Sequence, residues 1–392
     1  MNSFANFFRK PIFSDKRFLL SIWIVLGVIG SLKGSKIHNN YLIFKGVFNH
    51  TIQQINLYTA YPSEYHDSNH YGPFFSLIIA PFTFLPDQIG VLLWNLSMGL
   101  CLFVAFYYLP IQWRKMYLFF YIVLIQLYTC IMNSQTNGLI AALIIGSFLF
   151  IRKEKDFWAA CFIMLGVFIK LYGIVGLSFF FFSKHKGKFI VYLFFWAAIF
   201  FVLPMFISSP EFIIQSYYDW YASLSNKSVE NMTNFSQDMS AIGLVRRTFD
   251  IMDASALYII IPGIILFGLQ YIKTEKYNQL TYQLGILAST LLFMVLFSTG
   301  SESETYIIAL TGVSIWFFIQ EEPHKKWVVF LLLFTIFWTW VTTSHLFPKS
   351  IRVDIFKRYS LKALPCLVVW LILVYQLITS RGIIKLSNPD EL

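Results

Sequence analysis

Apolar runs about 15–22 residues long recur along almost the whole chain, with short polar segments between them. A run of this length crosses the hydrocarbon core of a bilayer as a helix, because a helix satisfies its backbone groups without water. The runs lie near residues 18–33, 74–86, 89–109, 117–132, 137–151, 157–182, 188–207, 254–272, 279–298, 305–319, 327–347 and 363–379. They predict an all-α polytopic membrane protein, with one membrane domain over residues 1–392.

The composition excludes an ordinary soluble domain. Charged residues make up 13% of the chain and hydrophobic residues 57%, whereas a soluble domain carries about 25% charge. The net charge of +10 raises the question of nucleic acid, but the basic residues sit at the ends of the apolar runs. Membrane topology explains that placement, so we expect membrane lipids and no nucleic acid as partners.

The basic clusters between the runs favour one topology. If they all face the cytoplasm, the positive-inside rule holds and two apolar runs become irregular. Residues 74–86 form a re-entrant or interfacial element, and residues 157–182 go out and return as two short helices with Lys170 near the bend. In the competing topology, 74–86 is a true crossing and 113–156 is inverted. We prefer the first, because the second puts five basic residues outside.

The preferred topology places two long polar stretches on the outer face of the membrane. Residues 34–73 form a first extracytoplasmic loop and residues 208–250 a second one, and the shorter segments Asn133–Asn137 and Ser298–Thr305 join them. The chain shows no clear internal repeat, which disfavours an inverted-repeat transporter. Any chemistry is therefore expected in these outer segments.

Placing the charge of Lys170 at membrane depth costs free energy, so this residue is a functional candidate. It could snorkel to the interface, or it could hold a phosphate as a point charge. The amides of Gln135 and Asn137 form either a polar turn or a set of groups that face a sugar or phosphate.

Acidic and basic side chains in the outer segments give further candidates. Glu302 and Glu304 lie at a boundary where partial burial raises a carboxyl pKa and suits it to general-base work. Residues two apart diverge on a helix, so we expect only one of them to face the site. Arg247 either binds a phosphate or anchors the chain to lipid headgroups.

The first outer loop combines aromatic residues with an acid. His66 and His70 are four residues apart, with Asp67 between them. A metal site is conceivable, but helical spacing is unproved so close to Gly72 and Pro73, and we favour a loop that lines a carbohydrate site. We therefore expect neither a metal nor a cofactor.

A series of short motifs then occurs in a recognisable order. It consists of Leu57–Pro62, Asp67, Tyr71–Pro73, Leu85 and Pro86, Leu92–Leu96, Gln135 and Asn137, Ile169 and Lys170, and Ser240, Gly243 and Arg247. Together, over about residues 35–320, they resemble glycosyltransferase family 87. The resemblance implies the C-type membrane glycosyltransferase fold, here a bundle of about 11–13 transmembrane helices, and transfer of mannose from a polyprenyl-phosphate donor.

The chain departs from the family at two places. The aspartate that usually opens the first outer loop is replaced by Asn40, so Asp67 becomes the candidate acid there. A Ser-Pro and histidine signature before a late helix is replaced by Ser301–Tyr306, which makes Glu302 the other candidate base.

These observations lead to one hypothesis. A hexose moves from a polyprenyl-phosphate donor to a glycan or glycolipid acceptor on the extracytoplasmic face of the cell membrane, with Asp67 or Glu302 taking the acceptor's proton and Lys170 and Arg247 holding the phosphate. The alternative is a transporter or flippase for a lipid-linked sugar. The expected substrate-binding residues are Asn40, His66, Tyr71, Gln135, Asn137, Lys170, Asp238, Ser240, Arg247 and Glu304.

Overall fold

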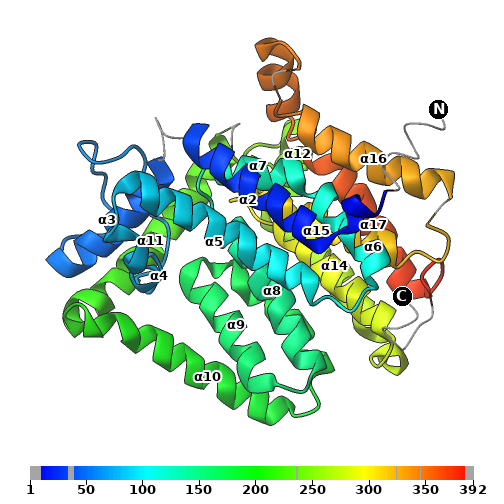
Figure 1. Cartoon of the computed structure of the whole chain (residues 1–392), viewed down its shortest axis with the longest axis horizontal. Coiled ribbons are helices and arrows are strands. Elements are labelled where there is room, and N and C mark those ends of the chain that lie inside the picture. Colours follow the sequence, from blue (N-terminus) through cyan, green and yellow to red (C-terminus); the bar gives the residue numbers. More distant parts are fainter. Residues whose placement is uncertain (1–9, 34–38, 235–236, 324, 345, 385–392) are drawn as a thin grey trace.

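The computed structural model describes residues 10–33, 39–234, 237–323, 325–344 and 346–384, and within them the regular elements are helices, apart from one isolated bridge between Gln320 and Ile383 (Figure 1). Three helices are long and apolar enough to cross a membrane, Asp87–Tyr107, Lys115–Met132 and Lys186–Phe206, and a series of shorter apolar helices accompanies them. The all-α membrane architecture is thus confirmed. The number of crossings and the C-type fold stay predictions.

The elements in the described residues follow one another as η1 (Pro11–Ser14), α2 (Lys16–Lys33), α3 (Asn39–Gln53), α4 (Phe75–Thr83), α5 (Asp87–Tyr107), α6 (Trp113–Ile122), α7 (Leu124–Met132), α8 (Asn137–Arg152), α9 (Asp156–Ile169), η3 (Leu171–Phe182), α10 (Lys186–Val202), η4 (Leu203–Phe206), α11 (Pro210–Thr233), α12 (Ala241–Thr248), α13 (Leu257–Leu269), η5 (Gln270–Ile272), η6 (Thr274–Lys276), α14 (Leu280–Leu296), η7 (Ser303–Thr305), α15 (Tyr306–Phe318), α16 (Lys326–Val341), the π-helix η8 (Ile351–Lys357) and α17 (Ala363–Thr379).

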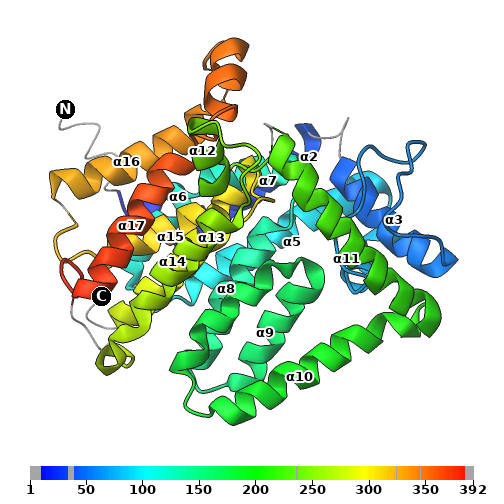
Figure 2. The ribbon, with the colours of Figure 1, turned by 180° about the vertical axis from the view of Figure 1, so that it is seen from behind.

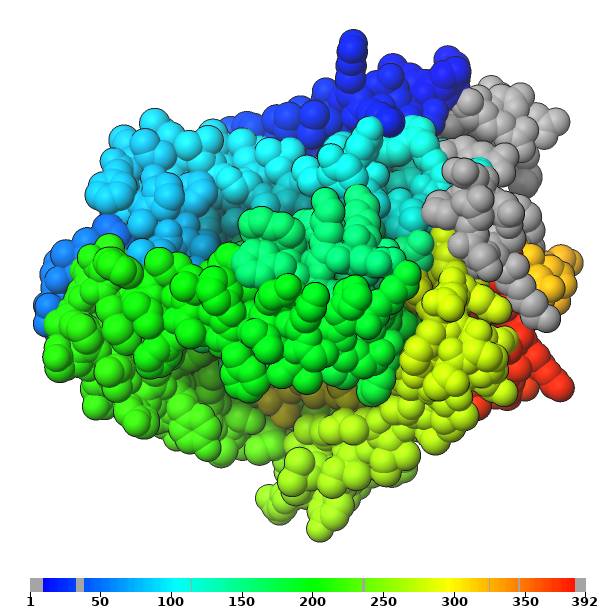
Figure 3. Space-filling model, turned by 90° about the horizontal axis from the view of Figure 1, so that it is seen from below, coloured from blue at the N-terminus to red at the C-terminus, as the bar shows by residue number. Residues whose placement is uncertain are grey.

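The core lies around α14 and α15, which pack against each other and against α17 and α8 (Figure 2). Nearly every residue of α14 and α15 is buried. By contrast, α10 turns large apolar side chains outward: Val191, Phe194 and Phe195 expose between 47% and 73% of their surface. In Figure 3, green atoms, which include those of α10, cover much of the visible face. Apolar exposure on this scale fits a surface that faces lipid.

The run 157–182 folds back on itself, as the sequence predicts. It breaks at Lys170, with α9 before it and η3 after it. A Cβ on Gly173 would lie 2.4 Å from the carbonyl carbon of Gly166, and one on Gly176 would lie 2.8 Å from Ile163. Both contacts pair residues equally far from the break, so the two helices are antiparallel. Lys170 therefore sits at the tip of a helical hairpin.

In the described residues, the two polar stretches that we expect on the outer face both contain helical segments. Residues 34–73 contain α3, with eight buried residues, and residues 208–250 are mostly α11 and α12. The expectation of long loops was wrong in this respect, because both helices find side-chain partners in the rest of the fold. Residues 74–86 form only the short helix α4, with Pro81 inside it. A helix that spans a bilayer needs about 20 residues, so α4 is too short to cross.

Candidate active site

A cavity of about 450 Å³ opens where α3, the segment between α3 and α4, the hairpin tip, α11 and the turn before η7 meet. Seven of the candidate catalytic and substrate-binding residues line it, although they come from five separate segments. They are Asn40, Asp67, Tyr71, Gln135, Lys170, Glu302 and Glu304. The tertiary structure thus brings an ammonium group, three carboxylates and amides to one place.

Lys170 reaches this cavity from the hairpin tip, where its backbone is extended (φ −157°, ψ 105°). Its Nζ lies 5.5 Å from the centre of the Tyr71 ring and 4.9 Å from that of Tyr172. Ring faces attract cations but provide no counter-charge. Among the described residues, no side chain or carbonyl forms a hydrogen bond or ion pair with this ammonium group. It is placed to receive an anion from the cavity.

The segment before α4 is fastened to the hairpin tip. The Gly72 N–H donates to the Ile169 carbonyl at 3.3 Å. A Cβ at Gly72 would lie 2.4 Å from the Phe168 carbonyl oxygen and 2.9 Å from the Trp220 ring, so only glycine fits there. The Tyr71 hydroxyl meets Thr136 Oγ1 at 3.0 Å. This packing keeps Tyr71 beside Lys170.

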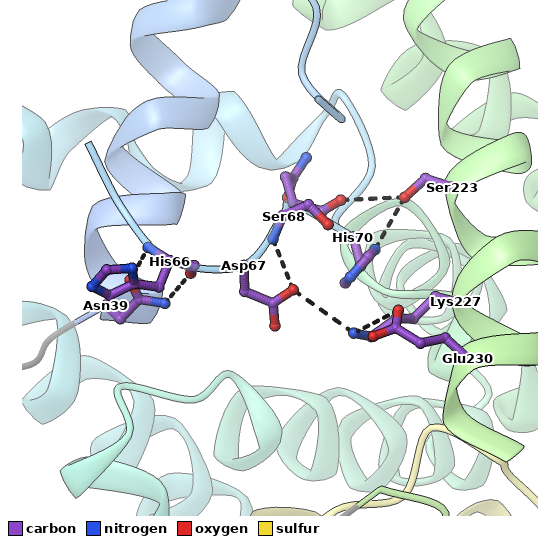
Figure 4. Close-up of polar contacts among 9 residues, drawn as sticks. Asn39, His66, Asp67, Ser68, His70, Ser223, Lys227 and Glu230 are labelled. Atoms are coloured by element: carbon purple, nitrogen blue, oxygen red, sulfur yellow. Dashed lines mark hydrogen bonds and ion pairs between the residues drawn. The ribbon is translucent and has the colours of Figure 1, made fainter. Parts of the chain in front are cut away.

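Asp67 faces the cavity opposite a lysine that the sequence reasoning missed. Lys227 of α11 lies 3.7 Å from the Asp67 carboxylate and 3.3 Å from that of Glu230 (Figure 4). Asp67 has a positive φ of 77°, which aspartate tolerates better than most residues, and Ser68 N–H donates to its Oδ1 at 2.8 Å. Its side chain is 56% exposed. Asp67 is therefore accessible, with a fixed backbone and a nearby cation.

Glu302 and Glu304 both line the cavity, contrary to the expectation that only one would. That expectation assumed a helix, but Glu302 is extended (φ −109°, ψ 178°) and caps η7 through a reciprocal capping box with Thr305. Burial raises the pKa of the Glu302 carboxyl, the nearby Glu304 charge adds to that shift, and Lys170 opposes it. A carboxyl with a raised pKa suits proton transfer near neutral pH.

Two buried side chains, those of Lys362 and Cys130, donate hydrogen bonds to the turn that carries Glu302 and Glu304. The Lys362 Nζ donates to Ser303 Oγ at 2.7 Å and to the Ser303 carbonyl at 3.1 Å. The Cys130 thiol donates to the Glu304 carbonyl at 2.9 Å. Both side chains are buried, with 2% and 3% exposure. Neither lines the cavity, so their contacts position the acidic turn.

The amide turn at Asn133–Asn137 is similarly anchored. The Asn133 Nδ2 donates to Glu304 Oε1 at 2.8 Å, and the Asn40 Nδ2 donates to the Asn133 carbonyl at 2.8 Å. The Trp94 indole donates to the Ser134 carbonyl at 3.0 Å. Asn40, at the position where the family usually has an aspartate, therefore supports the acidic turn through Asn133.

Two predicted substrate-binding residues lie away from the cavity. His66 is clamped to Asn39: its N–H donates to Asn39 Oδ1 at 2.6 Å, and its carbonyl accepts from Asn39 Nδ2. Its side chain lines a different cavity, on the other side of this clamp. Asn137 begins α8 and is buried, with 1% exposure. Neither residue touches the site.

The Ser240 to Arg247 motif also lies outside the cavity, and the phosphate role expected for Arg247 is corrected. Its guanidinium donates to four oxygens, the carbonyls of Asn234, Gln237 and Lys357 and the hydroxyl of Ser360. Ser240 caps α12 by accepting from the N–H groups of residues 242 and 243. The two terminal nitrogens of Arg247 and the Ser240 hydroxyl are thus engaged within the protein.

Asp238 belongs to the same cluster of hydrogen bonds at the start of α12. It accepts a hydrogen bond from the Ser240 hydroxyl at 2.5 Å, and its carbonyl accepts from Ser360 at 2.9 Å. A Cβ at Gly243 would lie 2.1 Å from that carbonyl oxygen, so the glycine of the motif is required for close packing. Burial raises the pKa of the Asp238 carboxyl to about 6, against the hydrogen bond from Ser240 and the charge of Arg247. The motif joins α12 to the segment before α17.

Sequence reasoning also missed one face of α11. Lys227 and Asn231 line the cavity together with Leu224 and Ser228. The Asn231 Oδ1 is buried and has no hydrogen-bond partner among the described residues. The spacing of three and four residues is the helical repeat, so a search for a polar helical face within 208–250 would have found them. In the described residues, no group of three or more His, Cys, Asp or Glu side chains is arranged to hold a metal.

These features define a class, a helical membrane protein with a polar cavity in which lysines and carboxylates meet. A model of glycosyltransferase family 87 matches residues 69–299, more than half of the chain. The chain therefore belongs to glycosyltransferase family 87 and is a membrane glycosyltransferase. The transporter alternative is set aside by this finding. Comparison with curated proteins finds none that matches.

Proposed function

We propose that this enzyme moves a hexose, by family resemblance mannose, from a polyprenyl-phosphate donor to a glycan or glycolipid acceptor, on the extracytoplasmic face of the cell membrane. One observation carries the proposal: the Lys170 ammonium reaches the cavity without an ion pair or hydrogen bond to the described residues, and the carboxylates of Asp67 and Glu302 line the same cavity. A phosphate anion complements such a cation in a partly dehydrated site.

The donor phosphate is assigned to Lys170 and Lys227. Lys227 replaces Arg247 in this role, because it lines the cavity and Arg247 does not. Lys227 already has two carboxylate neighbours, whereas Lys170 has two aromatic rings. We therefore assign the stronger phosphate contact to Lys170.

The reaction is a single inverting displacement. The acceptor oxygen forms a bond to the anomeric carbon while the bond from that carbon to the phosphate oxygen breaks. The phosphate leaves with the electron pair and keeps its negative charge beside the lysines. The acceptor's proton passes to a carboxylate, either Glu302 or Asp67. The raised pKa of Glu302 matches the demand on a base that works near neutral pH.

The test is transfer by the purified chain in lipid nanodiscs, measured with radiolabelled polyprenyl-phosphate mannose and glycan or glycolipid acceptors. Asp67→Asn and Glu302→Gln each keep the size of the side chain and remove its basicity. Loss of a general base costs about 10²–10⁴ in rate, so at least one variant should fall by that factor. Glu322→Gln is the matched control, because Glu322 pairs with Lys325 outside the cavity. Full activity in both cavity variants would overturn the assignment.

A further inference from the structure

A second hollow of about 320 Å³ lies along α11 and continues from the cavity. The two share Ser68, His70 and Lys227 in their linings, so a molecule that extends past these residues would occupy both. We call this hollow the α11 groove. It is lined by Asn56, Tyr58 and Thr59 and by the α11 face that bears Asp219, Ala222 and Asn226.

The walls of the α11 groove carry the groups that bind neutral hydroxyls. Asn226 and Thr59 are exposed, and Asp219 and Glu230 add carboxylates. Asp219 and Glu230 outnumber the one lysine of the lining, Lys227, which already pairs with Glu230 at 3.3 Å. Carboxylate and amide oxygens accept hydrogen bonds from sugar hydroxyls. Because Lys227 is already paired, the groove offers a phosphate no unpaired cation, whereas Lys170 in the cavity forms no ion pair with the described residues.

His70 stands at the junction of the cavity and the groove. Its Nδ1 lies 3.0 Å from Ser223 Oγ, and Ser223 in turn donates to the Asn69 carbonyl at 3.3 Å. Figure 4 shows His70 between Ser223 and the pair formed by Asp67 and Lys227. Its Nε2 is buried and has no hydrogen-bond partner among the described residues.

The charge of His70 follows from the same surroundings. Burial lowers the pKa of the His70 imidazole to about 4, and Lys227 contributes in the same direction. The ring is therefore neutral near pH 7, so Nε2 can exchange a hydrogen bond with a neutral hydroxyl without the cost of burying a charge.

We propose that the α11 groove is the acceptor site and takes a neutral, hydroxyl-rich glycan whose reacting end passes His70 to reach the cavity. This inference rests on the proposed function and names the second substrate of the same enzyme. It separates the two substrates by the state of the lysines: the anionic donor lies with Lys170, unpaired among the described residues, and the uncharged acceptor lies against Asp219, Asn226 and Glu230. A free glycan and the head group of a neutral glycolipid share this chemistry.

The test is a substitution that blocks the groove and leaves the cavity unchanged. Ala222 lines the groove but not the cavity, so Ala222→Trp should block the acceptor alone. Ser225→Trp is the matched control, since Ser225 is exposed on the same helix and lines neither hollow. Each variant in nanodiscs is assayed for transfer to neutral hexose oligosaccharides, to the same glycans on a lipid anchor, and to phosphorylated counterparts. Binding of polyprenyl phosphate and of the free oligosaccharides is measured separately.

We expect Ala222→Trp to raise the KM for neutral acceptors, or the Kd of the free oligosaccharide, about tenfold or more, with polyprenyl phosphate binding unchanged and Ser225→Trp like wild type. Preference for the lipid-anchored or the free glycan identifies the source of the acceptor. Equal behaviour of the two tryptophan variants, or a preference for phosphorylated acceptors, overturns the inference even if wild type transfers sugar. Absence of wild-type transfer and of polyprenyl phosphate binding sinks the proposed function instead, and oligosaccharide binding to Ala222→Trp still decides the groove.

Discussion

Replacement of Lys170 by methionine separates a phosphate-binding role from a structural one. Methionine keeps much of the length of the side chain and removes the charge. The lysine loses no ion pair or hydrogen bond to described residues in this change, only its contacts with the Tyr71 and Tyr172 rings at 5.5 and 4.9 Å. Such contacts contribute about 0.5–2 kcal/mol each, and relief from burying a charge offsets them. The ligand-free protein should therefore keep its thermal stability.

The affinity for the donor should fall sharply. Removing one partner of a desolvated charge pair costs about 2–5 kcal/mol, which corresponds to about 30-fold to 4,000-fold in Kd at about 1.4 kcal/mol per factor of ten. Lys227 remains in the Lys170→Met variant and still contacts the cavity. We therefore expect the lower end of the range, about 100-fold.

The assay is binding of polyprenyl phosphate to the chain in nanodiscs, with a thermal melt of the same samples. Lys153→Met is the matched control, because the Lys153 ammonium also lies over a tyrosine ring, 5.8 Å from the centre of Tyr108, but lines no part of the cavity. A Kd for Lys170→Met within threefold of wild type would refute the reasoning. So would an equal loss in Lys153→Met.

Three further predictions follow from the same geometry. In Gly173→Ala the new Cβ meets Gly166 backbone at 2.4 Å, which should lower stability by about 1–3 kcal/mol, whereas Gly187→Ala, with open space around it, should melt like wild type. Arg247→Met leaves three carbonyls and a hydroxyl without their charged donor, which should cost about 3–5 kcal/mol in stability, yet polyprenyl phosphate binding by the folded fraction should stay normal; weakened binding would restore its phosphate role. If Glu302 is the base, kcat should fall with decreasing pH through a pKa raised above the usual value for glutamate, since only the ionised form accepts a proton, and an acid limb at or below the usual value would argue against Glu302 as the base.

Sequence patterning predicted the parts of the fold that depend on neighbouring residues. The helical hairpin at 157–182 followed from an apolar run with basic clusters at both ends, and the structure breaks it at Lys170. The polar stretches at 34–73 and 208–250 were recognised, but their helices α3 and α11 were not. Those helices are mixed in polarity and are stabilised by packing against other segments, so a hydrophobicity pattern alone does not reveal them.

The candidate site likewise contains residues that the sequence identified and residues that only the tertiary structure identified. Lys170 and Glu302 were selected because a charge within or beside an apolar run is costly, which is a local property of the chain. Asp67 was selected as the acid of an aromatic loop and from the family resemblance. Lys227 escaped notice because a lysine on a polar helix is ordinary until a distant carboxylate is found beside it. Arg247 was misassigned because its four oxygen partners come from two segments far apart in the sequence.

The order of residues by itself thus determined that the chain enters a membrane, where its helices break, and which charges are too costly to be accidental, because the free energy of transfer to lipid is summed over adjacent residues. Only the tertiary structure decided that Lys170, Lys227, Asp67 and Glu302 share a cavity while Arg247, Asp238 and Ser240 hold α12 in place. The reason is that a hydrogen bond or ion pair requires two groups within a few ångströms, and that proximity arises from the packing of helices that are remote along the chain.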